Sequence, residues 1–223
     1  MFSILVIMDV EQQKKVLIQK LKDEGRISSQ AVEHAFKNIP RERFVPSHLK
    51  KQAYHDRPLD IGQGQTISAP HMVAIMVEAL DLHEGQKILE IGAGSGYHAA
   101  IVSHLVGEKG KVYSVERLQV LAKMAQQHLN DANIANVSVV VGDGSVGLED
   151  YAPYDRIYVT CSAPSTPKIL FDQLGEQGKL LIPVGGMMAQ LLLFEKKKDE
   201  IRRRDLGGCA FVPLVGKYGY DSL

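Results

Sequence analysis

The sequence predicts an α/β protein with a doubly wound, mostly parallel sheet, preceded by N-terminal helices and completed by antiparallel strand pairing near the C-terminus. Two observations lead to this class. From Lys87 onward, short apolar runs rich in β-branched residues alternate with segments of helical periodicity. This alternation is typical of right-handed βαβ units, in which a parallel sheet is covered on both faces. The 223 residues, 45% hydrophobic and 23% charged, are also enough to bury one such core.

The N-terminal part is predicted to be helical. Residues 10–24 show helical periodicity and end at Gly25, and Ser28 stands as a cap before a second short apolar run. Two prolines in "IPRERFVP" then indicate an irregular connection. In "PHMVAIMVEALDL", Pro70 is a natural first helical residue. Apolar residues then occur on nearly all sides of the helix, which predicts that it is buried.

The remaining elements follow from the alternating pattern. In chain order, the predicted strands and helices are the strand "KILEIG", the helix "GYHAAIVSHLVG", the strand "KVYSVE", the helix "LQVLAKMAQQHLNDA", the strands "VSVVVG" and "DRIYVTC", the helix "PKILFDQLG" and the strand "KLLIPVG". "QLLLFEKKKDEIRRRDL" predicts two antiparallel strands joined by a charged turn around Lys198 to Glu200. We expect residues 1–82 to form a helical segment with a substrate-side loop, packed on an α/β unit of residues 83–223 in one compact domain.

Charge and cysteine content exclude several functional classes. The 26 basic and 26 acidic side chains cancel, so no global field recruits nucleic acid or an anionic membrane. Cys161 and Cys209 have neither disulfide-framework nor metal-ligand spacing, which favours a reducing cytoplasm and no metal site. The apolar run at the N-terminus is too short to span a bilayer and lacks the features of a signal peptide, and Met8 is an alternative start. We expect a cytoplasmic monomer without a membrane or nucleic-acid partner.

A glycine-rich turn joins the first parallel strand to its helix. "LEIGAGSGYHAA" places Gly92, Gly94 and Gly96 where a backbone without Cβ atoms can lie against a ligand and where the helix N-terminus offers free N–H donors. A glycine-rich turn of this kind also occurs without any ligand, so the motif alone is a weak signal.

Two carboxylates at later strand ends strengthen the prediction of a nucleotide site. Glu116 ends the second strand, twenty residues after Gly96, where a carboxylate can accept both hydroxyls of a ribose. Asp143 in "GDGS" ends the third strand, where it can accept a hydrogen bond from an adenine amino group, although Asp-Gly is also a common turn. Open α/β sheets bind ligands at the carboxyl edge of their strands, so we expect these positions to form one site.

The third glycine comes one residue sooner than in NAD-binding turns, and Glu90 precedes the first glycine by two residues. Here the chain resembles the class I S-adenosylmethionine-dependent methyltransferases, with their Rossmann-like sheet, through "LEIGAGSGY", "VER" and "GDG". The segments "GQGQTISAPHMVAIM", "GDGSVGL", "APYDRIYVTCSAP", "QGKLLIPVG" and "FVPLVG" resemble the protein-L-isoaspartate O-methyltransferases in particular, over about residues 39–220. The resemblance implies methyl transfer from S-adenosylmethionine, with S-adenosylhomocysteine as product, to isoaspartyl proteins and peptides.

The resemblance also implies roles for individual residues. Those for the cofactor are Gly92, Gly94 and Gly96 at the methionine and ribose, Glu116 at the ribose, and Asp143 with Gly144 at the adenine. Ser68 matches the family's active-site serine, and the expected substrate-binding residues around it are Ile61, Thr66, His71 and, in a strand-like segment that offers backbone contacts, Val212. Ala93, where threonine or serine is frequent, and Cys161 with Ser162, where alanine or glycine is common, depart from the family pattern.

The chemistry agrees with these residue types. An ionised carboxylate is already a nucleophile at neutral pH, so methyl transfer to it needs positioning more than a strong base. The hydroxyls of Thr66 and Ser68 suit that purpose. Ser68 has a competing interpretation as a helix N-cap before Pro70, and His71, on the first turn of an apolar helix, has a structural one.

Two other classes of function remain open on the sequence. A methyltransferase acting on nucleic acid or another small molecule would share the cofactor site, but "TCSAP" stands where nucleic-acid amino-methyltransferases often carry an Asn/Asp-Pro-Pro-Tyr/Phe motif. A dehydrogenase that uses NAD, or a non-enzymatic nucleotide-binding module, is the second class. Binding of S-adenosylmethionine without binding of NAD would separate them.

Overall fold

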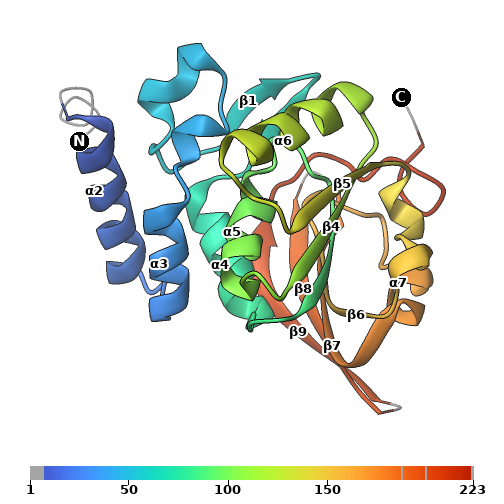
Figure 1. Cartoon of the computed structure of the whole chain (residues 1–223). Helices are drawn as coiled ribbons and strands as arrows, with labels where there is room; N and C mark the ends of the chain where they lie inside the picture. The colour runs from blue at the N-terminus through green and yellow to red at the C-terminus, as the bar shows by residue number, and fades with distance from the viewer. Residues whose placement is uncertain (1–7, 187, 199, 222–223) are drawn as a thin grey trace.

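The computed structural model describes residues 8–186, 188–198 and 200–221. It contains a seven-stranded sheet in the order β5-β4-β3-β6-β7-β8-β9 and a separate two-stranded sheet, β1-β2 (Figure 1). Strands β5, β4, β3, β6 and β7 run parallel, and β8 and β9 add antiparallel pairs. The predicted doubly wound α/β class with C-terminal antiparallel pairing is therefore confirmed.

The elements have the following bounds. The α-helices are α2 Val10–Asp23, α3 Gln30–Asn38, α4 Pro70–Leu80, α5 Tyr97–Val106, α6 Gln119–Asp131 and α7 Lys168–Asp172. The strands are β1 Leu59–Gly62, β2 Gln65–Ile67, β3 Lys87–Ile91, β4 Lys111–Glu116, β5 Val137–Val141, β6 Tyr154–Val159, β7 Leu174–Gly185, β8 Ala189–Lys197 and β9 Glu200–Cys209. Short 3-10 helices are η1 Arg41–Arg43, η2 Ser47–Gln52, η3 Gly144–Val146 and η4 Glu149–Tyr151.

The alternation of side chains along the strands divides the core into two layers. In β3, Ile88 belongs to a cluster with the apolar faces of α2 to α6, whereas Leu89 and Ile91 belong to a second cluster with Leu170 of α7. Successive residues of a strand point to opposite faces, so both faces of the sheet are buried at β3. The first cluster contains Leu21 from the N-terminal segment and Ile88 from the α/β unit, so it spans the boundary predicted at residue 82.

Sequence signals fix the helix starts. The cap of α3 is Ser29, one residue after the predicted Ser28, and it accepts a hydrogen bond from the Val32 N–H. Asp9 caps α2 in the same way. Pro70 opens α4, as its fixed φ favours. The apolar N-terminal run "MFSILVI" lies outside the described residues, and within them no helix is long and apolar enough to cross a membrane.

The segment "GQGQTISAP" is more ordered than a loop. Gly62, Gln63 and Gly64 all have positive φ and form the turn of the β1-β2 hairpin, in which Asp60 pairs with Thr66. This hairpin was not expected, because three- and four-residue strands are too short to show alternation in the sequence. It fixes the residues that lead into α4.

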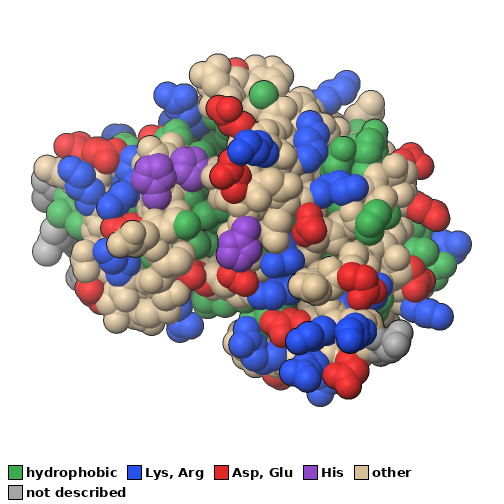
Figure 2. All heavy atoms as spheres, turned by 60° about the horizontal axis from the view of Figure 1, so that its bottom comes forward, with side chains coloured by type: hydrophobic (Ala, Val, Ile, Leu, Met, Phe, Trp, Pro, Cys, Tyr) green, Lys and Arg blue, Asp and Glu red, His purple; other side chains and the backbone are tan. Residues whose placement is uncertain are grey.

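The β8-β9 hairpin carries a local basic surface in spite of the balanced net charge. Basic side chains gather on this part of the molecule in Figure 2. They come from Lys196, Lys197, Arg202, Arg203 and Arg204. β8 begins at Ala189, opposite Gly185 at the carboxyl end of β7, and ends at Lys197, which pairs with Glu200 of β9. The basic side chains therefore lie toward the end of the sheet opposite the carboxyl ends of the parallel strands (Figure 1).

Candidate active site

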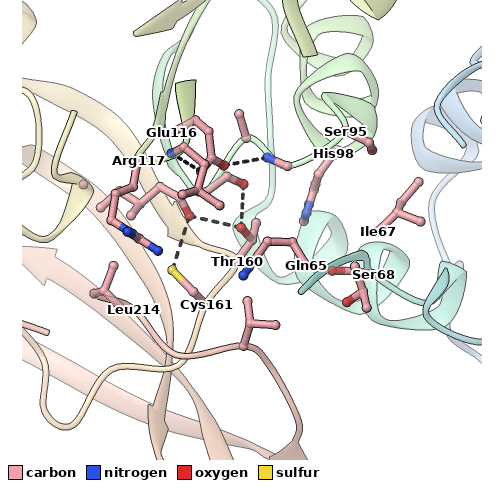
Figure 3. A pocket seen from close by; sticks show the side chains of 18 of the residues that line it. Gln65, Ile67, Ser68, Ser95, His98, Glu116, Arg117, Thr160, Cys161 and Leu214 are labelled. Atoms are coloured by element: carbon pink, nitrogen blue, oxygen red, sulfur yellow. Dashed lines mark hydrogen bonds between the residues drawn. The ribbon is translucent and has the colours of Figure 1, made fainter. Parts of the chain in front are cut away.

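A cavity opens at the carboxyl ends of the parallel strands, and we call it the strand-end cavity (Figure 3). Side chains and backbone from six parts of the chain line it. They are the β2-α4 connection with Thr66 and Ser68, the turn after β3 from Gly92 to Ser95 with Tyr97 and His98 of α5, the end of β4 from Val115 to Leu118, Gly144, Thr160 and Cys161 after β6, and residues 212–215. Parallel strands bring their carboxyl ends to one edge of the sheet, which explains how segments so far apart in sequence meet.

The first two glycines of the turn face the strand-end cavity, whereas the third serves packing. Gly92, Gly94 and Gly96 have φ of +97°, +54° and +84°, which favour glycine. A Cβ on Gly92 would overlap Oγ1 of Thr160, whose hydroxyl donates a 2.6 Å hydrogen bond to the Gly92 carbonyl. Gly96 does not line the cavity: a Cβ there would lie 3.2 Å from the Ala125 carbonyl oxygen of α6.

Glu116 is held against the glycine turn. Its Oε2 accepts a hydrogen bond from the Gly94 N–H at 3.0 Å, and its Oε1 accepts one from the Leu118 N–H at 2.9 Å. The side chain is buried and lines the strand-end cavity. A carboxylate fixed in this way retains lone pairs for hydroxyl donors of a ligand.

Asp143 and Gly144 take different positions. Gly144 lines the strand-end cavity and packs so closely on Ile91 that a Cβ would overlap that side chain. The Asp143 carboxylate is outside the lining and accepts hydrogen bonds from the N–H groups of Ser145 and Lys217, both at 2.8 Å. Burial raises the pKa of Asp143, but these hydrogen bonds outweigh it and hold the pKa below its usual value.

Of the residues expected on the substrate side, Thr66, Ser68 and Val212 line the strand-end cavity, whereas Ile61 and His71 do not. Thr66 is exposed, Ser68 is half-buried, and both line the strand-end cavity. Ile61 lies behind them on β1, where its Cδ1 would be 3.5 Å from a Cβ on Gly94. The N-cap of α4 is Ala69, and Ser68 makes no capping hydrogen bond to this helix, so the interpretation of Ser68 as an N-cap is wrong.

His71 points to a different partner. Its backbone N–H and its Nδ1 both contact Oδ1 of Asp56, at 2.9 and 2.8 Å. It is not among the residues that line the strand-end cavity.

The segment around Val212 closes one side of the strand-end cavity. Its backbone is extended beside Ser162: the Ser162 N–H donates to the Val212 carbonyl and the Leu214 N–H donates to the Ser162 carbonyl, both at 2.8 Å. The Ser162 hydroxyl donates to the Gly185 carbonyl at the β7-β8 corner. The serine that departs from the family pattern thus ties together two segments at the rim of the cavity.

Comparison with known proteins identifies this arrangement. Residues 12–219 match the family model described as "Protein-L-isoaspartate(D-aspartate) O-methyltransferase (PCMT)". A protein-L-isoaspartate O-methyltransferase from Archaeoglobus fulgidus is 50% identical, over 97% of this chain and 99% of its own length. Another from Methanopyrus kandleri is 53% identical over 92% of each chain. The chain belongs to the protein-L-isoaspartate O-methyltransferase family.

Solved structures of this family have the same fold. One, named protein-L-isoaspartate O-methyltransferase, superposes with a TM-score of 0.83 at 34% identity and covers 92% of this chain and 67% of that one. A second, from Plasmodium falciparum and in complex with S-adenosyl-L-homocysteine, gives a TM-score of 0.81 at 28% identity, over 90% of this chain and 97% of that one. The predicted family and its S-adenosylmethionine dependence are confirmed.

The residues of this isoaspartate methyltransferase fit the cofactor. Its amino-acid and nucleoside parts need hydrogen-bond donors, a hydroxyl acceptor and an apolar wall, and the strand-end cavity offers each. Backbone at Gly92 and Gly94 has no Cβ in the way, Glu116 supplies the acceptor, and Val115 and Leu214 supply apolar surface. His98, buried in the lining, has neither ring nitrogen hydrogen-bonded.

Sequence reasoning missed several lining residues. Thr160, which donates a hydrogen bond to the Gly92 carbonyl, and Cys161 were not predicted to line the site, although their place directly after the fourth parallel strand was a usable signal. Burial raises the pKa of the Cys161 thiol well above its usual range, so Cys161 is an unreactive thiol in this wall. His98 and Leu214 carried no local signal, since only the fold brings them to the cavity.

Proposed function

We propose that this chain transfers the methyl group of S-adenosylmethionine to the free α-carboxylate of L-isoaspartyl residues in damaged proteins and peptides. The observation that carries the proposal is the strand-end cavity itself, which Thr66 and Ser68 line together with the glycine turn at Gly92 and Gly94. Family membership supplies the reaction class, and this geometry supplies a place for an acceptor carboxylate beside the cofactor.

The reaction needs positioning more than proton transfer. Bound S-adenosylmethionine supplies an electrophilic methyl group on a sulfonium. A carboxylate oxygen of the substrate forms the new bond to the methyl carbon as the carbon–sulfur bond breaks, and the electron pair of that bond goes to sulfur. Because the nucleophile is ionised at neutral pH, no base has to remove a proton.

Ser68 and Thr66 orient the acceptor in this proposal. Their hydroxyls donate hydrogen bonds to the isoaspartyl carboxylate and leave one oxygen aimed at the methyl group. Fixed orientation of this kind contributes roughly 7–11 kcal/mol in favourable cases. The β1-β2 hairpin, with Asp60 opposite Thr66 and Ile61 against the glycine turn, holds the loop in place.

The glycine turn, Glu116, Asp143 and Gly144 bind the cofactor. Glu116 accepts the ribose hydroxyls and Gly144 lets the adenine approach the sheet edge. In this proposal, residues up to 82 supply the substrate-side loop, and residues 83–223 supply the cofactor side together with the peptide-contacting segment at Val212. The product is an α-methyl ester, which cyclises spontaneously to a succinimide and reopens in part to normal aspartate, so the function is repair.

Backbone at the rim fits a substrate with many flanking sequences. The extended segment at Val212 and the β1-β2 hairpin both border the strand-end cavity. Backbone hydrogen bonds to an extended peptide are independent of its side chains.

The decisive experiment measures methyl transfer from labelled S-adenosylmethionine to a peptide with one isoaspartate and to its twin with normal aspartate. We expect methylation of the first alone. Equal rates on both peptides, or no transfer to either while S-adenosylmethionine binds, would overturn the assignment of the substrate.

A nucleic-acid substrate is disfavoured by the distribution of charge. The β8-β9 hairpin ends at the other end of the sheet from the carboxyl edge where the strand-end cavity lies (Figure 1), so its basic side chains would not guide a phosphate backbone into the cavity. We therefore propose an enzyme without a nucleic-acid partner. We further propose a monomer, since residues of one chain line the strand-end cavity, and a cytoplasmic location, which its two free cysteines favour. Light scattering coupled to size exclusion tests the monomer, and filter binding with RNA and DNA tests the partner.

A further inference from the structure

His98 is the buried polar side chain of the strand-end cavity whose role is unexplained. It lies on the first turn of α5, is 6% exposed, and lines the cavity. Neither Nδ1 nor Nε2 has a hydrogen-bond partner. Burying an imidazole with both nitrogens unsatisfied is costly, and native structures rarely leave such groups without a reason.

The surroundings of the ring leave the cavity as the place for a partner. The Tyr158 ring lies at a centroid distance of 4.6 Å and a tilt of 41°, so a phenol packs against the imidazole on the side of the sheet. In Figure 3, the His98 side chain extends from α5 into the strand-end cavity between Thr160 and Ser68. Glu116 and Arg117 lie on the other side of Thr160 in this view.

The charge state of His98 makes it a neutral donor. Burial lowers its pKa to about 3, so at physiological pH the ring has one N–H and one lone pair. Among the lining residues that the structure describes, the charged side chains are Glu116 and Arg117. A carboxylate bound near Ser68 must therefore rely on neutral donors.

We propose that His98 binds a carboxylate in the strand-end cavity, donating a hydrogen bond from its imidazole N–H. Two carboxylates enter this cavity in the proposed reaction, that of the cofactor's methionine part and that of the isoaspartyl acceptor. The inference rests on the proposed function for the second of these and on the cofactor alone for the first.

Two substitutions separate hydrogen bonding from packing. His98→Leu removes both ring nitrogens but keeps an apolar side chain of moderate size, whereas His98→Gln keeps a neutral N–H donor. Calorimetry with S-adenosylhomocysteine and with 5′-methylthioadenosine, which lacks the amino-acid part, reports on the cofactor. Initial rates with the isoaspartyl peptide report on the acceptor.

Each source of the carboxylate gives its own pattern. If the partner is the methionine carboxylate, His98→Leu weakens S-adenosylhomocysteine binding about 10- to 100-fold, the effect of a hydrogen bond to a charged group, and leaves methylthioadenosine binding unchanged. If the partner is the acceptor, both affinities are retained and kcat/KM for the peptide falls by a similar factor. In both cases His98→Gln restores most of the loss.

Other outcomes overturn the inference. Equal weakening of both nucleosides by His98→Leu, or failure of His98→Gln to restore binding or rate, would mean that the ring only packs. His104→Leu, further along α5 and outside the strand-end cavity, is the control and should change neither quantity.

A measurement on the unmodified protein keeps the test independent of folding of the variants. The ¹⁵N resonances of the His98 ring should shift on saturation with S-adenosylhomocysteine but not with methylthioadenosine, or else only when isoaspartyl peptide is added to the S-adenosylhomocysteine complex. Resonances that respond to none of these would refute the contact. A clear cofactor response with no methylation of the peptide would uphold His98 and overturn the proposed function instead.

Discussion

Asp56 holds the N-terminus of α4 through a single oxygen that contacts both the backbone N–H and the ring Nδ1 of His71, at 2.9 and 2.8 Å. The other oxygen of Asp56 accepts a hydrogen bond from Nζ of Lys20 at 3.1 Å. The N-cap position of α4 is Ala69, which has no side-chain acceptor, so a carboxylate fourteen residues before the helix supplies the acceptor in its place. This contact orders the helix that follows the substrate-side loop.

Asp56→Ala should destabilise the fold by about 1–3 kcal/mol, because it removes a charged acceptor from a helix N-terminus. Burial raises the pKa of Asp56, but hydrogen bonds from His71 and Lys20 outweigh it and hold the pKa well below its usual value. The stabilisation is therefore complete above pH 3.8 and is lost as the pH falls through the lower, folded-state pKa. Urea unfolding at pH 7 and in the acid range measures both effects. Asp172→Ala, exposed on α7, is the control, and equal stability of the two variants at pH 7 would refute this role.

Ser68→Ala should leave stability and S-adenosylhomocysteine affinity nearly intact and lower kcat/KM for the isoaspartyl peptide roughly 10-fold or more. The reason is that Ser68 does not cap α4 and lies on the acceptor side of the strand-end cavity. Ser29→Ala makes a matched comparison: that serine caps α3, so its loss should cost about 0.5–2 kcal/mol of stability and no activity per folded molecule. A Ser68→Ala enzyme with unchanged rates would remove Ser68 from the reaction.

The parallel half of the fold was predictable because its strands and helices are long enough to show their periods. Runs such as "KILEI" and "VSVVV" are rich in apolar and β-branched residues, as the strands of a parallel sheet are. The β1-β2 hairpin was missed because strands of three and four residues at a glycine-rich turn show no period. The contact of His71 with Asp56 was missed for another reason: it joins two segments that become neighbours only in the folded chain.

The residues of the site also divide into those that the sequence could place and those that it could not. Gly92, Gly94 and Glu116 could be placed because the carboxyl ends of parallel strands meet by geometry. His98 and Leu214 could not, since their cavity-facing positions depend on how α5 and the C-terminal segment pack. Gly96 shows the limit of a motif, because a glycine of the fingerprint packs against Ala125 and does not line the cavity.

Asp143→Ala should weaken S-adenosylhomocysteine binding, by roughly 0.5–3 kcal/mol, if the carboxylate accepts from the adenine amino group. The substitution also frees the N–H groups of Ser145 and Lys217, so affinity alone does not identify a direct contact. S-inosylhomocysteine, which has a carbonyl in place of that amino group, separates the two effects by calorimetry. A direct contact makes the variant insensitive to the exchange of adenine for hypoxanthine, whereas an indirect one leaves the discrimination of the unmodified protein in place.

Glu90→Gln should stabilise the fold at neutral and alkaline pH. Glu90 is fully buried on β3, between Ser114 of β4, which donates a hydrogen bond to it, and Tyr158 of β6. Burial raises its pKa from 4.5 to about 8, and the negative charge of Glu116 adds to this. In the unfolded chain the carboxyl ionises near pH 4.5, so between these two values the unfolded state binds fewer protons than the folded one.

The contribution of Glu90 to the stability of the unmodified protein must then fall as the pH rises from 4.5 to about 8, and this loss levels off above the folded-state pKa. Glutamine cannot ionise, so the difference between the two unfolding free energies should grow across this window to the order of a few kcal/mol. His98, whose lowered pKa makes stability rise between pH 3 and 6.5, is present in both proteins, and its contribution cancels in the difference. Urea unfolding at intervals from pH 4 to 9, with exposed Glu149→Gln as control, measures that difference. Parallel curves for Glu90→Gln and the unmodified protein would show that Glu90 ionises in the fold near its ordinary pKa. That result would refute the prediction that the buried carboxyl is protonated at neutral pH.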